Sequence, residues 1–208
     1  MSPVLERLKK MDYEVLLLPE PLDELVVSSL GEFDGKRLVD AAKDDLADIF
    51  GDDTDDDADA GDFEPLCESL KEFLGSDKVA GVKLSKRLTE SPAALVEGAY
   101  GMSPVMRRYM QAQATTADDF NAYGTASPVI EINPKSPVVL ALRDGDLDTP
   151  EARDSADLLF DVASLTGGYD IADAGAFATK VTALMGGVTI PPKQDEPEEE
   201  PKDVEGLP

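Results

Sequence analysis

A run of aspartates interrupts the chain after its first quarter and limits how the chain can fold. Residues 51–62 read Gly-Asp-Asp-Thr-Asp-Asp-Asp-Ala-Asp-Ala-Gly-Asp, without a large apolar side chain. Closely spaced like charges repel one another, and the run lacks the apolar surface that offsets the entropy of ordering a backbone. We therefore predict a disordered acidic linker over 51–62, which separates a small N-terminal piece, 1–50, from a main domain, 63–190.

The end of the chain has a similar character. Residues 191–208 are rich in Pro and Glu and contain few large apolar side chains. Such a composition does not build a packed core. We predict a disordered acidic tail over 191–208.

The N-terminal piece contains short helical and strand patterns. Ser2-Pro3 is typical of a helix start, with a cap residue followed by Pro at the first helical position. The apolar residues that follow have helical spacing, and a compact apolar run then ends at Pro19. The expected elements are a helix from Pro3, a short buried strand over 13–18, a helix over 23–30 and a strand over 37–41.

The main domain mixes strand and helix patterns without the regular alternation of a doubly wound sheet. Strand-like runs cover 79–84, 93–100 and 129–132. Helical patterns cover 63–74, 104–114, a short segment from Pro137, 150–165 and 172–185. This order predicts an α+β fold, with a small mixed sheet, surrounding helices and a helix pair at the end.

Composition excludes several classes of chemistry. The 208 residues have a formal net charge of -25, so the chain has no electrostatic reason to bind nucleic acid or an anionic membrane surface. The chain has no His, and Cys67 is its single Cys. Imidazole catalysis, thiolate zinc clusters and intrachain disulfides are therefore excluded. No apolar run has the length of a transmembrane helix, and the first residues lack the apolar core of a signal peptide.

Closely spaced Asp residues, as in the acidic run, also occur in calcium-binding loops. An EF-hand needs Gly at its sixth position and Glu at its twelfth, and frames that start at Asp57 or Asp144 both fail this test. Phosphate-binding glycine motifs are also absent from the sequence. We therefore expect no metal, no cofactor and no catalytic residues, and the chain is not expected to be an enzyme. An acidic, cation-buffering interaction protein is the alternative function.

A methionine-rich helical face stands out in the main domain. On a helix that begins at Pro104, the residues Met106, Tyr109 and Met110 lie on one face, with Met102 just before it. Methionine is flexible and polarisable, so it suits surfaces that fit many partners. Basic residues also outnumber acidic ones from residue 78 to 110. The face is either an adaptable binding surface or the inner face of a core helix.

Two amphipathic helices end the main domain. Each is short for an isolated helix, so each must bury its apolar stripe on the domain or on a partner. Two such pairs, from two chains, would form a four-helix bundle. The stripes consist of Leu158, Leu159, Val162 and Leu165 in the first helix and Phe177, Val181 and Leu184 in the second.

Several sequence blocks resemble the C-terminal part of the 90-kDa heat-shock protein chaperones. Residues 2–8 (Ser-Pro-Val-Leu-Glu-Arg-Leu), 13–16, 20–24 and 32–36 resemble the end of that family's middle domain. Blocks at 87–92, 106–113 and 131–134, together with Leu158 to Asp161, resemble its C-terminal domain. The blocks occur in the family's order over about residues 2–186.

The resemblance implies a chaperone fragment that forms homodimers and binds unfolded client proteins. Residues 1–50 would be the end of the middle domain, and 63–190 would be the C-terminal dimerisation and client-contact domain. The family's ATP-binding domain would lie outside this chain. The resemblance implies client contacts through Met102, Met106, Tyr109 and Met110, and dimer contacts through the two stripes, with Leu158, Leu159, Val162, Leu165, Phe177, Val181 and Leu184.

The sequence also departs from the family's pattern. Met102 stands where the family usually has Trp, and Arg107 stands where it has Glu. The cytosolic tail motif that docks tetratricopeptide co-chaperones is absent, so no such docking is expected. A truncated gene model or fragment would explain a start so deep in the family's pattern. The blocks look most like endoplasmin, which favours the endoplasmic reticulum lumen, with the cytoplasm or a plastid as alternatives, although the usual retrieval signal is missing.

Overall fold

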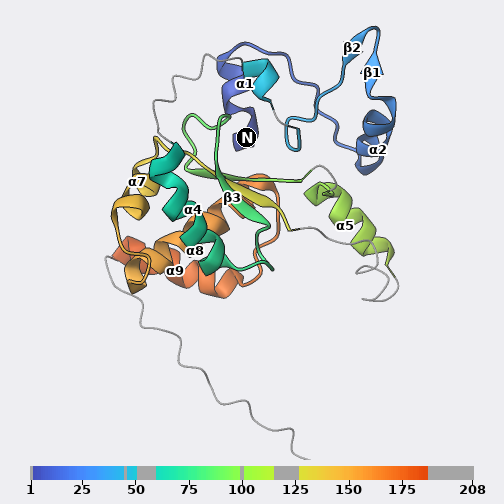
Figure 1. Ribbon diagram of the computed structural model, residues 1–208. Helices are drawn as coiled ribbons and strands as arrows, with labels where there is room; N and C mark the ends of the chain where they lie inside the picture. The colour runs from blue at the N-terminus through green and yellow to red at the C-terminus, as the bar shows by residue number, and fades with distance from the viewer. Residues whose placement is uncertain (1, 45, 51–59, 99–100, 115–126, 187–208) are drawn as a thin grey trace, which may run out of the picture.

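The computed structural model describes residues 2–44, 46–50, 60–98, 101–114 and 127–186. Helices and strands alternate irregularly along them (Figure 1). The first part contains η1 (Pro3–Leu5), α1 (Glu6–Lys10), α2 (Pro21–Leu30), β1 (Glu32–Phe33), β2 (Lys36–Arg37) and α3 (Ala47–Phe50). The second part contains α4 (Ala60–Leu74), β3 (Gly81–Leu84), β4 (Ala93–Val96), α5 (Pro104–Gln113), β5 (Val129–Ile132), α7 (Pro137–Asp144), α8 (Pro150–Gly167) and α9 (Ala174–Gly186).

The main sheet has three strands in the order β3-β5-β4. β5 is parallel to β3, with Val82 opposite Ile130, and antiparallel to β4, with Leu95 opposite Ile130. Helices α4 and α8 pack on the sheet, α7 contacts both of these helices, and α9 packs on α8 (Figure 1). The expected α+β class with a small mixed sheet is therefore confirmed.

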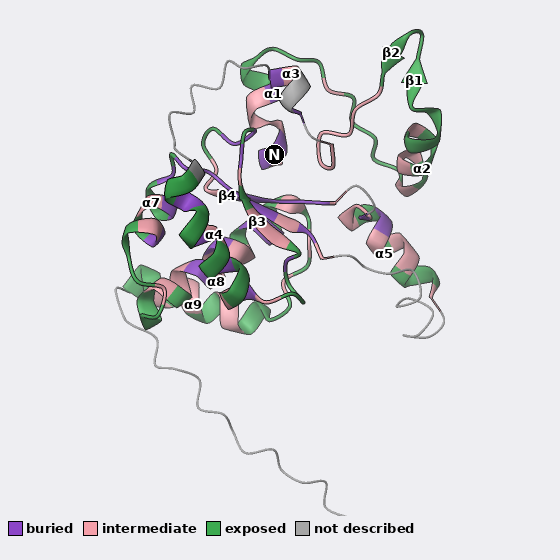
Figure 2. Ribbon diagram, in the orientation of Figure 1, coloured by how far each residue is buried: buried purple, intermediate pink, exposed green. Residues whose placement is uncertain are grey.

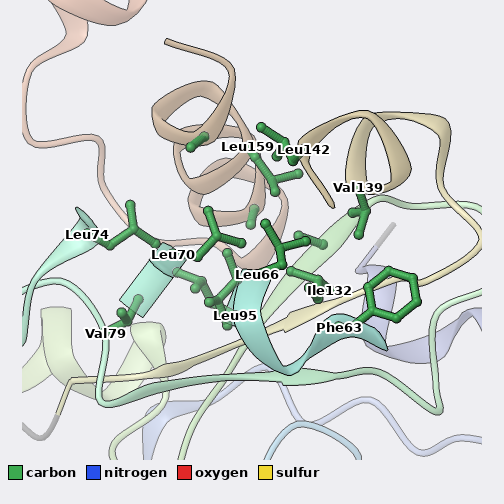
Figure 3. Packing of buried hydrophobic residues seen from close by; sticks show 14 residues of the cluster. Phe63, Leu66, Leu70, Leu74, Val79, Leu95, Ile132, Val139, Leu142 and Leu159 are labelled. Carbon is green, nitrogen blue, oxygen red and sulfur yellow. The ribbon is translucent and has the colours of Figure 1, made fainter. Parts of the chain in front are cut away.

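Alternation along β4 divides the interior into two clusters. Side chains of a strand point to opposite faces in turn. Ala93 and Leu95 belong to the main core with α4, α7 and α8 (Figure 3). Ala94 and Val96 belong to a smaller cluster with Val4 of η1. All four residues of β4 are buried, because both of its faces are covered.

Helix α4 provides one wall of the main core. Phe63, Leu66, Leu70 and Leu74 recur at helical spacing and are each at most 5% exposed. Figure 3 shows this row of side chains beside Val79, Ile132 and Leu159. The expected helix over 63–74 is confirmed, but it begins earlier, at Ala60. Residues 60–62 of the expected linker are therefore helical, and 51–59 lie outside the described residues.

Polar contacts attach the first part to the main sheet. The Glu6 carboxylate accepts hydrogen bonds from the backbone N–H groups of Thr89 (2.7 Å), Glu90 (2.8 Å) and Ser91 (3.1 Å). Arg87 donates to the carbonyl oxygens of Ala41 and Asp44 in return. The parts on either side of the acidic run thus touch directly, which the sequence did not predict.

Two expected strands differ in the structure. Residues 13–18 form no strand, and Leu16 and Leu17 are 80% and 77% exposed. A strand requires a neighbour to bond its backbone, and no described strand pairs with this segment, although Val15 packs against the cluster of Leu8, Leu46 and Phe50. Of the strand expected over 37–41, only Arg37 lies in a strand, and 38–41 form none. Arg37 belongs to β2, which forms a short hairpin with β1, and Asp34 and Gly35 supply the positive φ values of its turn.

The remaining expected helices appear near their predicted positions. α5, α7 and α8 each begin with Pro at the first helical position, preceded by Ser or Thr. α9 begins two residues later than expected. The expected tail, 191–208, lies outside the described residues. Among the helices that the structure describes, none is long and apolar enough to cross a membrane.

Candidate functional site

Helix α5 carries the methionine-rich face and is held at its start by side-chain capping. The Ser103 hydroxyl accepts a hydrogen bond from the backbone N–H of Met106 at 3.1 Å. Such a cap satisfies one of the N–H groups that a helix start leaves without a partner. The same hydroxyl donates to the Glu24 carboxylate of α2. The N-terminus of α5 is therefore fixed against α2.

The four predicted client-contact residues have different environments. Met106 is 4% exposed and serves to anchor α5, because its side chain is enclosed by the chain itself. Met102, Tyr109 and Met110 are half-buried, so part of each side chain faces solvent. Val105, which was not predicted, is 42% exposed on the same helix. We call the apolar residues in and just before α5 that face solvent at least in part the solvent-facing surface of α5: Met102, Val105, Tyr109 and Met110.

A buried carboxylate fastens α5 to the turn between α8 and α9. Glu97 directly follows β4, and its side chain is 3% exposed. Arg107 of α5 pairs with it at 3.4 Å, and the Tyr169 hydroxyl donates a hydrogen bond to the same oxygen. The Arg107 guanidinium also lies 5.8 Å from the centre of the Tyr169 ring. Glu97 thus joins three elements that are distant in sequence.

Burial dominates the electrostatics of this cluster. It raises the pKa of Glu97, and the hydrogen bond from Tyr169 and the charge of Arg107 offset only part of this effect. Burial also raises the pKa of Tyr169, and the adjacent Glu97 carboxylate raises it further. For Glu24, burial raises the pKa, but hydrogen bonds from Lys43 and Ser103 outweigh it, so the net pKa is lowered.

A second contact joins α5 to the C-terminal helices. Arg108 donates to the carbonyl oxygen of Gly168 at 2.8 Å and approaches the Asp170 carboxylate at 3.8 Å. Gly168 ends α8 in the left-handed conformation, with φ of 83°, which suits Gly because it has no Cβ. The capping turn of α8 is therefore also the docking point of α5.

The predicted dimer stripe of α8 divides between two faces. Leu159 is 4% exposed and packs on the sheet with Ala156 and Ala163. Leu158 is half-buried, whereas Val162 and Leu165 are 39% and 49% exposed. Positions 158, 162 and 165 share a helix face, and position 159 lies on the adjacent one. Leu159 must therefore be reassigned from the outer stripe to the core of its own chain.

Helix α9 lies on α8 and leaves apolar residues in solvent. Phe177 and Val181 are half-buried, and Leu184 is 69% exposed, as is Met185 at 85%. Figure 2 shows much of the α9 ribbon as exposed. Lys180 pairs with Asp157 of α8 at 2.8 Å, and this contact fixes how the two helices lie. The outer apolar face of the pair comprises Leu158, Val162, Leu165, Phe177, Val181, Leu184 and Met185.

Glu131 of β5 forms a buried ion pair with Arg87, which the sequence analysis also did not predict. Glu131 of β5 is 2% exposed and accepts hydrogen bonds from Arg87 (3.0 Å) and Ser85 (2.7 Å). The sequence signal for this pair was Glu131 itself, an acidic residue within an apolar strand run, but its partner Arg87 lies 44 residues away. For Glu97, the signal was an acid directly after the fully apolar strand 93–96. Neither signal identifies the partner.

The described residues contain no cluster of His, Cys, Asp or Glu side chains arranged to hold a metal ion. Cys67 is half-buried in α4, and burial raises the pKa of its thiol, as does the charge of Glu64. A thiol with a raised pKa is a poor nucleophile near neutral pH.

Comparison with known proteins identifies the family. The family model described as Hsp90 protein matches residues 1–206. A chloroplastic heat shock protein 90-5 of Arabidopsis thaliana is 35% identical over 187 residues, which are 88% of this chain and 24% of the relative. A chaperone protein HtpG of Alkalilimnicola ehrlichii is 39% identical over 192 residues, which are 88% of this chain and 28% of the relative.

The chain thus spans about a quarter of the length of these two relatives. The first of these relatives is named as a chloroplastic protein, and the second is a bacterial protein. The family model covers nearly every residue of the chain, including α5, α8 and α9. The protein therefore belongs to the Hsp90 family of chaperones.

Proposed function

We propose that this chain is the dimerisation and client-contact part of an Hsp90 chaperone. The observation that carries the proposal is the outer apolar face of α8 and α9. The adjacent face of α8 already fills the core through Leu159 and Ala163, yet Val162, Leu165 and Leu184 stay in solvent. Exposed apolar residues that lie together on a well-formed helix pair are typical of an interaction surface. A second copy of the pair would complete a four-helix bundle.

The energetics favour such a dimer. Burying a Leu or Phe side chain contributes roughly 1.5–3 kcal/mol. Several such side chains from each chain therefore outweigh an association cost of about 4–15 kcal/mol. The pair of Lys180 with Asp157 already holds α9 against α8 before association, and Lys78, from the segment before β3, pairs with the same carboxylate.

The dimer is tested by sedimentation velocity at about ten micromolar, a concentration suited to the micromolar-or-tighter affinity that such a face implies. We expect a dimer for the unmodified chain and a folded monomer for the double variant Val162→Glu, Leu165→Glu. Val138→Glu is the matched control, since Val138 is similarly exposed, at 44%, but lies on α7. A monomeric unmodified chain would exclude the proposed interface.

The solvent-facing surface of α5 is the proposed client contact. Met102, Tyr109 and Met110 offer partly exposed, adaptable apolar surface, while Met106 and the Glu97–Arg107 pair hold the helix in position. Arg108 adds a positive charge beside them, in a chain that is strongly acidic. The proposed partner is an unfolded polypeptide with apolar side chains.

Client binding is tested with fluorescently labelled, reduced and carboxymethylated α-lactalbumin, a permanently unfolded probe. The double variant Tyr109→Ser, Met110→Ser should weaken binding at least about tenfold, which corresponds to the loss of one to two apolar contacts. Gln111→Ser, an exposed change on the same helix, is the control. If the double variant and the unmodified chain bind the probe with equal affinity, the client site does not lie on this surface of α5.

The chain itself is proposed to lack ATP hydrolysis, which in this reading belongs to other parts of full-length family members. Nothing like a glycine-rich phosphate loop occurs in the sequence. Titration with a fluorescent ATP analogue should show no binding at micromolar concentrations. Saturable binding in that range would contradict this assignment.

For the compartment we propose a plastid, supported by the chloroplastic relative from Arabidopsis. The endoplasmic reticulum lumen, favoured by the resemblance to endoplasmin, and the cytoplasm are the alternatives. Immunogold labelling of source cells with an antibody against this chain decides between them.

A further inference from the structure

Helix α5 is held in place mainly by polar contacts, since Met106 is the only buried residue of this fully described helix. Ser103 bonds to Glu24 and fixes the start of the helix, and two arginines fix its middle. Figure 1 shows α5 at the edge of the molecule, with α2 beside it. An element with so little buried apolar surface opens at a lower free-energy cost than the core does. Release of α5 therefore does not require the core to unfold.

The contact of α5 with Glu97 satisfies only one of the two carboxylate oxygens. Oε1 of Glu97 faces both the Arg107 guanidinium, at 3.4 Å, and the hydroxyl of Tyr169. Oε2 of Glu97 and Nε of Arg107 are buried, and neither has a hydrogen-bond partner among the described residues. A buried charged oxygen without a donor raises the free energy of the ionised form, because water no longer solvates it. Ionised Glu97 is therefore poorly compensated while α5 is docked.

The segment that leads into α5 closes tightly over the same carboxylate. Gly101 is buried and lies three residues before the first residue of α5. A Cβ placed on Gly101 would lie 2.3 Å from Oε2 of Glu97, much closer than two atoms approach without a bond. The side chain of Glu97 is 3% exposed. Its carboxylate therefore gains access to water when this segment and α5 move away.

The charged and titratable groups that face Glu97 come from four parts of the chain. They are Arg107 of α5, Tyr169 of the turn after α8, Lys43 of the segment before α3 and Glu24 of α2. Lys43 and Glu24 pair with each other, so their effects on Glu97 largely cancel. Burial has the largest effect, and it raises the pKa of Glu97 although Tyr169 and Arg107 lower it. The docked arrangement thus suits neutral Glu97 better than ionised Glu97.

We propose that Glu97 is a charge-controlled latch on α5, which releases the helix readily while its carboxylate is ionised and keeps it docked once it is protonated. Release adds the enclosed Met106 to the solvent-facing surface of α5, so the apolar surface offered to a client grows. Arg107 stands at a position where this chain departs from the family's pattern, so the pair with Glu97 is a feature of this sequence. Only the last step, the use of Met106 by a client, rests on the proposed function.

Proton linkage sets the direction of the effect. When α5 is released, Glu97 meets water and its pKa returns towards the ordinary value of 4.5. When α5 is docked, burial keeps the pKa above that value. Docking is therefore most favourable below pH 4.5 and becomes less favourable as the pH rises through the pKa of the docked state.

Amide hydrogen exchange of the full 208-residue chain tests the latch without any client. Exchange is measured between pH 5 and 7.5 and expressed as protection relative to the intrinsic rate at each pH. We expect protection in α5 to be at least about threefold lower at pH 7.5 than at pH 5, while protection in α4 stays constant because the core does not open. Glu24, whose pKa is lowered, stays ionised throughout this range.

Glu97→Gln should keep α5 protected at both pH values, because the amide cannot ionise. The matched control is Glu72→Gln, which removes an exposed carboxylate from α4 and should behave like the unmodified chain. Protection in α5 of the unmodified chain that does not change with pH would overturn the proposal. A pH dependence that persists in Glu97→Gln would overturn it too.

Oxidation of Met106 by hydrogen peroxide reports the release of α5 directly, since the sulfoxide forms faster on an accessible methionine. Peptide mass spectrometry should show Met106 oxidised at least about threefold faster at pH 7.5 than at pH 5, in line with the loss of protection. Met185, which is 85% exposed, is the reference and should react equally at both pH values. The unmodified chain carries this test by itself, so it does not depend on the folding of a variant. Equal oxidation of Met106 at both pH values would refute the latch.

Binding of labelled, carboxymethylated α-lactalbumin at pH 7.5 tests the use of Met106 by a client. Glu97→Gln should bind the probe at least about threefold more weakly than the unmodified chain, because Met106 stays enclosed. Equal affinity would refute this step of the proposal. The double variant Tyr109→Ser, Met110→Ser tests the client surface separately. If that variant binds as well as the unmodified chain while protection in α5 still follows pH, the client surface is refuted and the latch is confirmed.

Discussion

At the residue scale, the buried Arg87–Glu131 pair is a clear point of vulnerability. Both side chains are at most 5% exposed, so loss of Arg87 leaves the Glu131 carboxylate in the interior with only the largely exposed Lys83 as an ion-pair partner. Breaking a buried pair from one side costs about 3–5 kcal/mol. We expect Arg87→Ala to lower the free energy of unfolding by that amount, as measured by urea denaturation.

Lys83 provides the matched control for this prediction. It also pairs with Glu131, at 3.2 Å, but its side chain is 54% exposed. An exposed pair contributes at most about 1 kcal/mol, so Lys83→Ala should be mild. Equal losses for Lys83→Ala and Arg87→Ala would show that burial does not set the strength of these contacts.

Glu97 leads to a prediction about pH. Burial raises its pKa above the usual 4.5, with Arg107, Tyr169, Lys43 and Glu24 as the facing charged or titratable groups. A carboxyl whose folded pKa is raised favours the folded state below 4.5, and this contribution is lost as the pH rises through the folded pKa. Glu97→Gln keeps an acceptor for Tyr169 without the buried charge.

We therefore expect Glu97→Gln to be more stable than the unmodified chain at neutral pH. The difference should shrink as the pH falls towards 4, where Glu97 itself is protonated. Thermal unfolding followed by circular dichroism between pH 4 and 7.5 measures it. A variant that loses stability at pH 7 would indicate that the Arg107 pair outweighs the cost of burial.

At the element scale, the end of α8 depends on a backbone conformation that only Gly adopts easily. Gly168 has φ of 83°, and the nearest atom to a Cβ built there is 4.0 Å away, so space is not the obstacle. The left-handed conformation costs a residue with a Cβ about 1–2 kcal/mol. Gly168→Ala should lower the unfolding free energy by that amount in denaturant titration.

The control is Gly81→Ala in β3, where φ is not positive and a Cβ meets nothing within 4 Å. This change should be neutral within about 0.5 kcal/mol. Because Arg108 donates to the Gly168 carbonyl, Gly168→Ala should also loosen α5. Faster amide exchange in α5 would confirm the link, and unaltered exchange would separate the cap from the docking of α5.

At the scale of the whole molecule, net charge opposes the proposed dimer. Each chain carries a formal charge of -25, and the acidic run and the tail contribute much of it. Salt screens such repulsion over a Debye length of about 10 Å at 0.1 M. We expect the dimer dissociation constant to fall as NaCl rises from 20 to 300 mM in analytical ultracentrifugation. Weaker association at high salt would indicate an interface held by ion pairs rather than apolar contact.

Local patterns were sufficient for most elements of the fold. Apolar spacing predicted α4 and α8, and Ser-Pro and Thr-Pro pairs predicted the starts of α5, α7 and α8. These predictions succeed because a helix cap and an apolar stripe each depend on residues only a few positions apart. The α+β class followed from the order of these elements. The resemblance to Hsp90 proteins, now supported by a match over residues 1–206, also came from ordered sequence blocks.

What the tertiary structure alone decided are the pairings between distant residues. Sequence spacing placed Leu159 with the outer stripe, but contact with the sheet assigns it to the core, since a helix face is defined only by what packs on it. The run 13–18 reads as a buried strand, yet it stays exposed because a strand exists only beside a partner. Glu97, Arg107 and Tyr169 are in contact because the fold brings together residues that are distant in sequence, and no pattern among neighbouring residues indicates such a contact.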